Sequence, residues 1–209
     1  MERLIVLDTE TTGIRPEEGH RIIEVGAVQI LNREITSTEF HKYVQPNRPV
    51  GDSVNIHGIT DKFLINKPQF DKISDDLLSF IEGATLIIHN APFDLGFLDN
   101  ELKINGISKK IEDICQIIDT LELSKKQRPG TMHNLDALCR RFGVDTSART
   151  RHGALLDAQI LAQVYLAMTG GQSILFQESS DIKSQISDPA LIKENMNNKD
   201  NIKVIYANK

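Results

Sequence analysis

The feature that most constrains this chain is a short apolar run, Leu4–Leu7, that ends in two carboxylates, Asp8 and Glu10. A run of four apolar residues is typical of a buried strand. Side chains two residues apart share a face of a strand, so both carboxylates lie on the same side as Val6. Because burying an unpaired charge is costly, this strand end is the first candidate site.

Two further aspartates stand on stretches that are predicted to be helical. Asp94 follows the segment Asn90–Phe93 and falls in the first turn of a helix, where the positive helix end favours the ionised form. Asp157 lies within a predicted helix, Ala154–Met168, and its neighbours at helical spacing are apolar. Both side chains are therefore expected to face the core.

Four carboxylates close together would raise one another's pKa values unless a cation holds them. No basic residue occupies the same strand end or helix stripe, so a divalent metal is the favoured explanation. Hard oxygen ligands suit Mg²⁺ or Mn²⁺. The alternative treats each acid separately, as a helix cap or a solvated residue.

The pattern of apolar residues predicts an α/β fold. Strands are predicted at Leu4–Leu7, Arg21–Leu31, Phe40–Val44, Thr85–Ile88 and Ile111–Ile114. Helices are predicted at Phe70–Ile81, from about Pro92 onward, at Leu135–Phe142 and at Ala154–Met168. Three strands followed by alternating helices and strands indicate a mixed five-stranded sheet flanked by helices.

A change of composition at Gly170-Gly171 divides the chain into a domain, residues 1–171, and a flexible tail, residues 172–209. Residues 177–201 are rich in Ser, Asp, Asn, Gln and Lys, which is typical of a linker. Ile202–Tyr206 is a last short β-like run.

Composition excludes several classes of protein. A chain of 209 residues that is 40% hydrophobic can build a real core. Its net charge of −5 argues against a strongly basic protein that coats nucleic acid, though not against nucleic acid held through metal ions. No apolar run approaches the ~20 residues of a membrane span, and the N-terminus has no signal-peptide core, so we expect a cytoplasmic protein without a membrane partner. Cys115 and Cys139 are expected to be reduced and structural.

Three motifs surround the acids: Asp8-Thr9-Glu10-Thr11-Thr12-Gly13, His89-Asn90-Ala91-Pro92-Phe93-Asp94 and His152-Gly153-Ala154-Leu155-Leu156-Asp157-Ala158. In this order they resemble the DEDDh exonucleases, and among them the DnaQ-like proofreading (epsilon) subunits of bacterial DNA polymerase III. The resemblance covers about residues 3–176. It implies a ribonuclease-H-like exonuclease fold and 3′→5′ removal of nucleotides from DNA. It also implies site roles: direct metal ligands Asp8, Glu10 and Asp157, a fourth acid Asp94, and a general base His152.

Elementary chemistry fits these roles. Two metals ~3.5–4 Å apart can stabilise the attacking and leaving oxygens of a phosphoryl displacement, and one lowers the pKa of the attacking water. Histidine is the natural base near neutral pH. His152 and Asp157 are five residues apart, about 140° around a helix. His152 is therefore expected on the flexible start of the helix, where Gly153 permits unusual backbone angles.

Other residues are weaker candidates for contact with a terminal nucleotide, beside the acids themselves. His57 matches a family histidine near that nucleotide. Asp52 matches the acidic position five residues earlier, but a simple loop acid explains it equally well. Phe93 either stacks on a base or belongs to the core. Hydroxyl and amide side chains that suit the sugar or phosphate are Thr9, Thr11 and Asn90.

The tail resembles a connector. The segment Gln172–Phe176 is similar to the clamp-binding peptides of bacterial replication proteins, with an exposed Gln172 followed by the apolar anchors Leu175 and Phe176 in extended chain. The alternative is a stretch packed on its own domain. The tail beyond it resembles the polymerase-binding end of the epsilon subunits, with Ile202–Tyr206 as the anchoring run.

The function that we expect is a two-metal 3′→5′ DNA exonuclease that removes mispaired 3′-terminal nucleotides as nucleoside 5′-monophosphates. The implied partners are a single-stranded or mispaired DNA 3′ end, the polymerase III alpha subunit, the beta sliding clamp and a small third core subunit. One alternative is a free DEDDh nuclease that trims RNA or short oligonucleotides, against which the clamp-like peptide argues. The other is a non-catalytic subunit that stabilises the polymerase, against which the five filled catalytic positions argue.

Overall fold

A mixed sheet forms the centre of the computed structural model, which describes the backbone of residues 3–147 and 149–186 and side chains as far as residue 170. Its strands are β1 (Arg3–Thr11), β2 (Ile22–Leu31), β3 (Glu34–Tyr43), β4 (Thr85–Ile88) and β5 (Gln116–Asp119), in the order β3-β2-β1-β4-β5. The β1, β2 and β3 strands pair antiparallel, whereas β4 runs parallel to β1 and β5 parallel to β4. The predicted five-stranded mixed sheet is confirmed.

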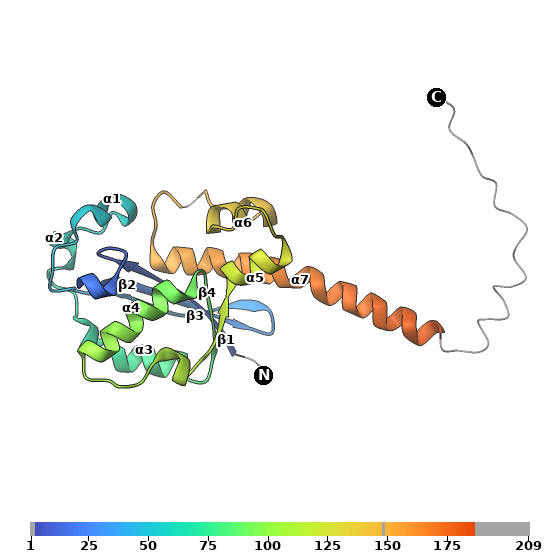
Figure 1. Ribbon diagram of the computed structural model, residues 1–209, viewed down its shortest axis with the longest axis horizontal. Coiled ribbons are helices and arrows are strands. Elements are labelled where there is room, and N and C mark those ends of the chain that lie inside the picture. The colour runs from blue at the N-terminus through green and yellow to red at the C-terminus, as the bar shows by residue number, and fades with distance from the viewer. Residues whose placement is uncertain (1–2, 148, 187–209) are drawn as a thin grey trace, which may run out of the picture. The chain divides into compact units, whose positions relative to one another are not determined.

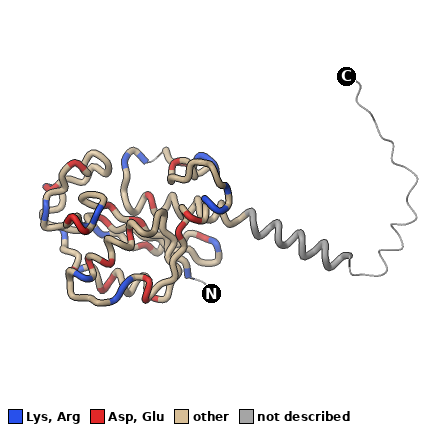
Figure 2. The backbone as a smooth tube through the Cα atoms, viewed as in Figure 1, with Lys and Arg blue, Asp and Glu red and all other residues tan. Residues whose placement is uncertain are grey.

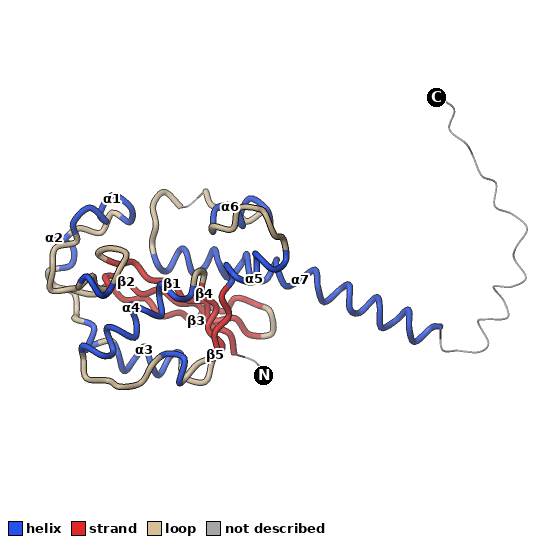
Figure 3. The backbone as a smooth tube through the Cα atoms, in the orientation of Figure 1, coloured by secondary structure: helices blue, strands red, loops and turns tan. Residues whose placement is uncertain are grey.

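Helices cover both faces of the sheet (Figures 1 and 3). The helices α3 (Ser74–Ile81) and α4 (Ala91–Ile104) pack on one face. The helix α7 (Ala154–Ile186) packs on the other face through its residues up to Met168. The helix α6 (Leu135–Phe142) packs on α7, and α5 (Thr120–Gln127) follows β5. The short helices are η1 (Pro16–Glu18), η2 (Gly51–Ser53), α1 (Val54–His57), α2 (Asp61–Leu64), η3 (Phe70–Lys72) and η4 (Ile111–Asp113).

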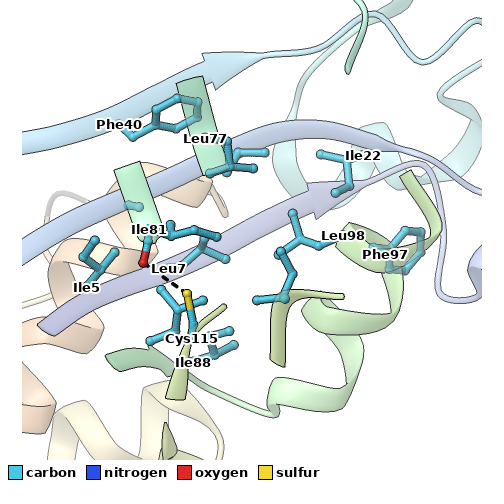
Figure 4. Close-up of a cluster of buried hydrophobic side chains, with 14 of the residues drawn as sticks. Ile5, Leu7, Ile22, Phe40, Leu77, Ile81, Ile88, Phe97, Leu98 and Cys115 are labelled. Atoms are coloured by element: carbon cyan, nitrogen blue, oxygen red, sulfur yellow. Dashed lines mark hydrogen bonds between the residues drawn. The ribbon is translucent and has the colours of Figure 1, made fainter. Parts of the chain in front are cut away.

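The alternation of side chains along β1 divides the core into two parts. Ile5 and Leu7 face α3 and α4, where they meet Leu77 and Leu98 (Figure 4). Val6 belongs to the cluster on the opposite face, together with residues of α7. Because side chains two residues apart share a face, Asp8 and Glu10 follow Val6 toward α7.

Two predicted strands differ from the structure. The third begins at Glu34 rather than Phe40, because Asn32 and Arg33 form a hairpin turn with positive φ values of 50° and 65°. The predicted strand Ile111–Ile114 is wrong, since its first three residues form η4 and the fifth strand begins at Gln116.

Local side-chain hydrogen bonds explain the turn at η4. The Asp113 carboxylate accepts a hydrogen bond from the Lys110 N–H over 2.8 Å, and Asp99 accepts one from the Ile111 N–H over 2.9 Å. Aspartate side chains thus supply the backbone with partners other than a sheet ladder. An apolar run alone does not reveal this competition.

The last helix is longer than predicted. It passes through Gly170-Gly171 and continues to Ile186, so the backbone at residues 172–176 is helical where we expected extended chain. Two glycines cost only ~1 kcal/mol each in a helix interior, and backbone hydrogen bonds on both sides can outweigh that cost. Residues 1–168 form one compact unit by themselves.

Three further properties concern the described part of the chain. None of its helices has the length and apolar character needed to cross a membrane. Its two cysteines, Cys115 and Cys139, are buried and free, and the Cys115 thiol donates to the Ile81 carbonyl over 3.1 Å (Figure 4). Lys and Arg are scattered over the described fold among Asp and Glu (Figure 2).

Candidate metal centre

Four carboxylates from three elements meet near the end of β1. Asp8 and Glu10 come from β1, while Asp94 and Asp157 come from the first turns of α4 and α7. Asp94 and Asp157 are each only 3% exposed. We call these four residues the acidic cluster. Possible ligand atoms of Glu10, Asp157 and His152 all lie within 4.8 Å of one another.

A close approach between α7 and β2 brings Asp157 to the strand end. A side chain at Gly26 would place its Cβ 2.2 Å from the Leu155 nitrogen, so only glycine lets the helix start come this near. Glu24 accepts a hydrogen bond from the Ala154 N–H over 3.2 Å, which ties β2 to the N-terminus of α7. The other oxygen of Glu24 lies 2.7 Å from His41 Nε2.

A second set of hydrogen bonds fixes the start of α4 and Asp94. The Asp119 carboxylate accepts hydrogen bonds from the N–H groups of Asn90 and Ala91, each over 3.1 Å. The Thr9 hydroxyl donates to Asp94 over 2.7 Å. Asp94 thus lies at a helix N-terminus, as predicted, and Thr9 of β1 holds its carboxylate in place.

Crowding and burial make the acidic cluster hold protons tightly. Burial, followed by the charge of Asp157, raises the pKa of Glu10 to about 8. Burial raises the pKa of Asp94 to about 7, despite the opposing hydrogen bond from Thr9. Burial also raises the pKa of Asp8, with contributions from Asp94, Glu10 and Asp157. At neutral pH the cluster therefore keeps protons unless further positive charge binds it.

A basic side chain does serve these acids, although none stands on the strand end or the helix stripe. Arg149 lies in the loop before α7, and its Nε and Nη2 donate to the two oxygens of Asp157 over 2.6 and 2.7 Å. The search along the strand end and the helix stripe missed it because a loop residue follows neither periodicity. One guanidinium does not neutralise four carboxylates, and the pKa values of Glu10 and Asp94 stay high beside it. The donor set therefore still fits divalent metal ions.

His152 lies in the loop two residues before the start of α7, as predicted. Its side chain is 49% exposed, and Nδ1 lies 3.1 Å from Asp157 Oδ2. The two residues meet although they are five apart, because His152 has left the helical path. Such a half-exposed imidazole beside a carboxylate has the properties of a general base.

The predicted substrate residues of the loop after β3 occupy different surroundings. Asp52 is exposed on η2. It is not among the charges that shift the pKa values of Asp8, Glu10 and Asp94 in the described part of the chain. His57 is buried on α1, and its Nδ1 accepts a hydrogen bond from the Ile59 N–H over 3.0 Å. Burial lowers the pKa of His57, against the opposing charge of Glu24. The Thr11 backbone acts on the ring, but Nε2 makes no hydrogen bond of good geometry within the described chain.

The remaining predicted contacts are partly engaged within the protein. The hydroxyl hydrogens of Thr9 and Thr11 go to Asp94 and to the Gly13 carbonyl. Asn90 is exposed at the start of α4. Phe93 is half-buried against the main core, with its ring centroid 5.0 Å from that of Phe97. Part of its side chain therefore belongs to the core, and the rest is exposed.

Sequence reasoning overlooked Arg149 and Glu24. Each had a signal: Arg149 stands three residues before His152, and Glu24 is the one charged residue within β2. The side chains of the tail residues Gln172, Leu175 and Phe176, and the run Ile202–Tyr206, lie outside the described part of the structure.

Comparison with known proteins shows which family this chain is similar to. A family model described as an exonuclease (RNase T) matches residues 5–165. The DNA polymerase III subunit epsilon of Haemophilus influenzae is 51% identical over 189 residues, which are 88% of this chain and 74% of that protein. The Escherichia coli subunit epsilon is 45% identical over 212 residues, 98% of this chain and 87% of that protein.

Solved structures agree on the fold. The nuclease domain of 3′hExo, a DEDDh family member bound to rAMP, superposes with a TM-score of 0.69 at 21% identity, covering 81% of this chain and 92% of that one. At this identity the likeness shows the fold alone, and it confirms the predicted ribonuclease-H-like exonuclease architecture.

Proposed function

The chain belongs to the exonuclease family and, within it, to the DNA polymerase III epsilon subunits, and from that membership we propose a two-metal mechanism for its proofreading activity. In this proposal the chain removes mispaired 3′-terminal nucleotides from DNA and releases nucleoside 5′-monophosphates. The observation that carries it is the convergence of ligand atoms from Glu10, His152 and Asp157 within 4.8 Å, beside Asp8 and Asp94.

Divalent metal use follows from the family, and the proposal assigns its ligands. Asp8, Glu10 and Asp157 hold the ions directly, and Asp94 completes the site. Two Mg²⁺ or Mn²⁺ ions would supply positive charge for the attacking and leaving oxygens of the phosphodiester. The raised pKa values of Glu10 and Asp94 support this assignment, because a bound cation would stabilise the ionised form that burial disfavours.

His152 takes the proton of the attacking water in this proposal. When Nδ1–H donates to Asp157 Oδ2, 3.1 Å away, the lone pair of Nε2 is free to accept that proton. Asp157 thereby orients the imidazole, and the half-exposed position in a loop gives His152 room to reach the substrate.

The terminal nucleotide is proposed to contact residues around this centre. His57 supports the idea best, because its buried Nε2 makes no hydrogen bond of good geometry in the described chain. Phe93 offers the exposed part of its ring to a base. The remaining contacts proposed with sugar or phosphate are Asp52, Thr9, Thr11 and Asn90.

We assign the partners by family membership together with the sequence of the tail. In a cytoplasmic polymerase III core the chain would bind the alpha subunit through its distal tail, a small third subunit, and the beta clamp through Gln172–Phe176. Replacing Leu175 and Phe176 by alanine should then weaken clamp binding sharply, because apolar anchors typically carry ≥2 kcal/mol each. Exonuclease rate and melting temperature should not change. Unchanged clamp affinity would contradict this assignment, and a joint loss of stability and rate would favour packing on the domain.

One assay tests the nuclease proposal. The isolated full chain is incubated with Mg²⁺ or Mn²⁺ on 3′-labelled single-stranded DNA, mispaired duplex, paired duplex and RNA. We expect metal-dependent release of mononucleotides, fastest from single-stranded and mispaired DNA ends. Preferential release from RNA would favour the free trimming nuclease, and no release with either metal would favour the non-catalytic subunit.

A further inference from the structure

The guanidinium of Arg149 joins the loop before α7 to two helices. Its Nε and Nη2 donate to the two oxygens of Asp157 over 2.6 and 2.7 Å. Its Nη1 forms an ion pair with Asp136 on α6. The Arg149 side chain is 9% exposed, so it is held between carboxylates on both sides rather than solvated.

The same guanidinium contacts the proposed base. Arg149 Nη2 lies 3.0 Å from His152 Nδ1, and Asp157 Oδ2 lies 3.1 Å from that same nitrogen. Because Nδ1 carries either a lone pair or a hydrogen, it accepts from Arg149 or donates to Asp157, but not both. When it accepts from Arg149, the hydrogen of the neutral ring is on Nε2. Neither ring nitrogen then has a lone pair free to take a proton.

A divalent cation and Arg149 compete for Asp157. The guanidinium engages both carboxylate oxygens in a fork, whereas a cation held by Glu10 and Asp157 needs one of those oxygens. The guanidinium and a cation bound to the same carboxylate would also repel each other.

Resting on the metal site proposed above, we propose that Arg149 is a positioning residue that holds Asp157 and His152 until a divalent cation binds, and then releases both. Release frees Nδ1–H to donate to Asp157, which leaves Nε2 as the proton acceptor. The base therefore becomes competent only when the metal site is filled.

The fold provides a place for the released side chain. A hollow of about 240 Å³ beside Arg149 is lined by Asp136 and by the loop that carries His152. Asp136 is 58% exposed and is already an ion-pair partner of Arg149. By keeping Asp136 after it leaves Asp157, the guanidinium avoids becoming an unpaired buried charge.

The first test compares metal affinity in matched variants. Binding of Mn²⁺ alone to the full chain is measured by titration calorimetry, without DNA. Arg149→Gln should bind Mn²⁺ ~10-fold more tightly than the natural chain, because a competing bidentate pair is gone. Arg151→Gln removes the same charge from an exposed position in the same loop, and it should change the affinity less than ~2-fold.

The second test separates release from a purely structural role. Arg149→Gln should lower the melting temperature of the metal-free protein, and the difference from the natural chain should close at saturating Mn²⁺. If Arg149 stayed on Asp157 when metal binds, Arg149→Gln would lower the melting temperature equally with and without metal. Arg149→Lys keeps the charge but loses the fork, so this variant should fold and should bind Mn²⁺ ~3-fold more tightly than the natural chain.

If Arg149→Gln and Arg149→Lys bind Mn²⁺ no more tightly than Arg151→Gln, or if the difference in melting temperature persists with metal, the role of Arg149 is overturned and the metal site stands. If the natural chain does not bind Mn²⁺, both the metal site and the role of Arg149 are overturned.

Discussion

Arg21 and Arg149 each hold a nearly buried carboxylate through two hydrogen bonds. Arg21 Nε and Nη2 lie 2.7 Å from the two oxygens of Glu101, and Arg149 Nε and Nη2 lie 2.6 and 2.7 Å from those of Asp157. The Glu101 side chain is 1% exposed and that of Asp157 is 4% exposed. The local geometry of the two pairs is almost the same.

Their surroundings differ. Glu101 also accepts a hydrogen bond from the Ile22 N–H over 3.2 Å. One positive and one negative charge therefore balance each other where the start of β2 contacts α4. Asp157 shares its guanidinium with an acidic cluster whose members raise one another's pKa values. The Arg21–Glu101 pair is thus balanced in charge, whereas the Arg149–Asp157 pair lies where negative charge is in excess.

The largest expected effect is on catalysis in the unbalanced region. Asp8→Ala should abolish nucleotide release from 3′-labelled single-stranded DNA with Mg²⁺, because a metal ligand is lost. The metal-free variant should melt at the same or a higher temperature than the natural chain, because removing a crowded carboxylate relieves repulsion. The exposed Asp76→Ala on α3 is the charge-matched control and should keep full activity. Near-normal activity of Asp8→Ala would remove Asp8 from the metal site.

His152→Ala tests the base in the same region. We expect the rate of the chemical step to fall ~10²–10⁴-fold while DNA affinity changes little, since proton transfer is lost but the carboxylates remain. The acidic limb of the pH profile of single-turnover rates should also change. A variant with the natural rate and pH profile would show that another group takes the proton.

Stability measurements compare the two pairs directly. Glu101→Gln should cost about 3–5 kcal/mol of unfolding free energy, because it leaves the Arg21 charge without its partner in a balanced region. Asp157→Asn should cost clearly less in the metal-free protein, because the loss of the ion pair is offset by reduced repulsion within the acidic cluster. Urea denaturation of both variants without metal measures the difference. Equal losses would show that surrounding charge does not distinguish the pairs.

The most gradual effect is the pH dependence of metal-free stability. The folded protein raises the pKa of Glu10 from 4.5 to about 8, so the folded state binds protons more tightly than the unfolded chain. The contribution of Glu10 is therefore largest below pH 4.5 and is lost as the pH rises to about 8. Melting temperature should fall by about 10 °C over this range without metal. Saturating Mg²⁺ should reduce the fall, and an unchanged slope would argue against metal binding by Glu10.

Much of the fold was accessible from periodicity. The helix Leu135–Phe142 was predicted with its observed bounds, and the alternation along β1 placed Asp8 and Glu10 on the face that α7 covers. The failure at Ile111–Ile114 has a local cause, because the carboxylates of Asp99 and Asp113 accept backbone hydrogen bonds that turn an apolar run into η4. Patterns of apolar residues carry no record of such partners.

The sequence alone determined which four carboxylates form the acidic cluster, because acids on apolar strands and helices stand out against a regular pattern. Asp8, Glu10, Asp94 and Asp157 were all found in this way. Only the tertiary structure decided what pairs with them. Glu24 reaches the Ala154 N–H across 130 residues of sequence, and Thr9 reaches Asp94 across 85. Arg149 meets Asp157 through the path of an irregular loop. Such contacts depend on how the chain closes in space, and the spacing of residues along the sequence does not encode that closure.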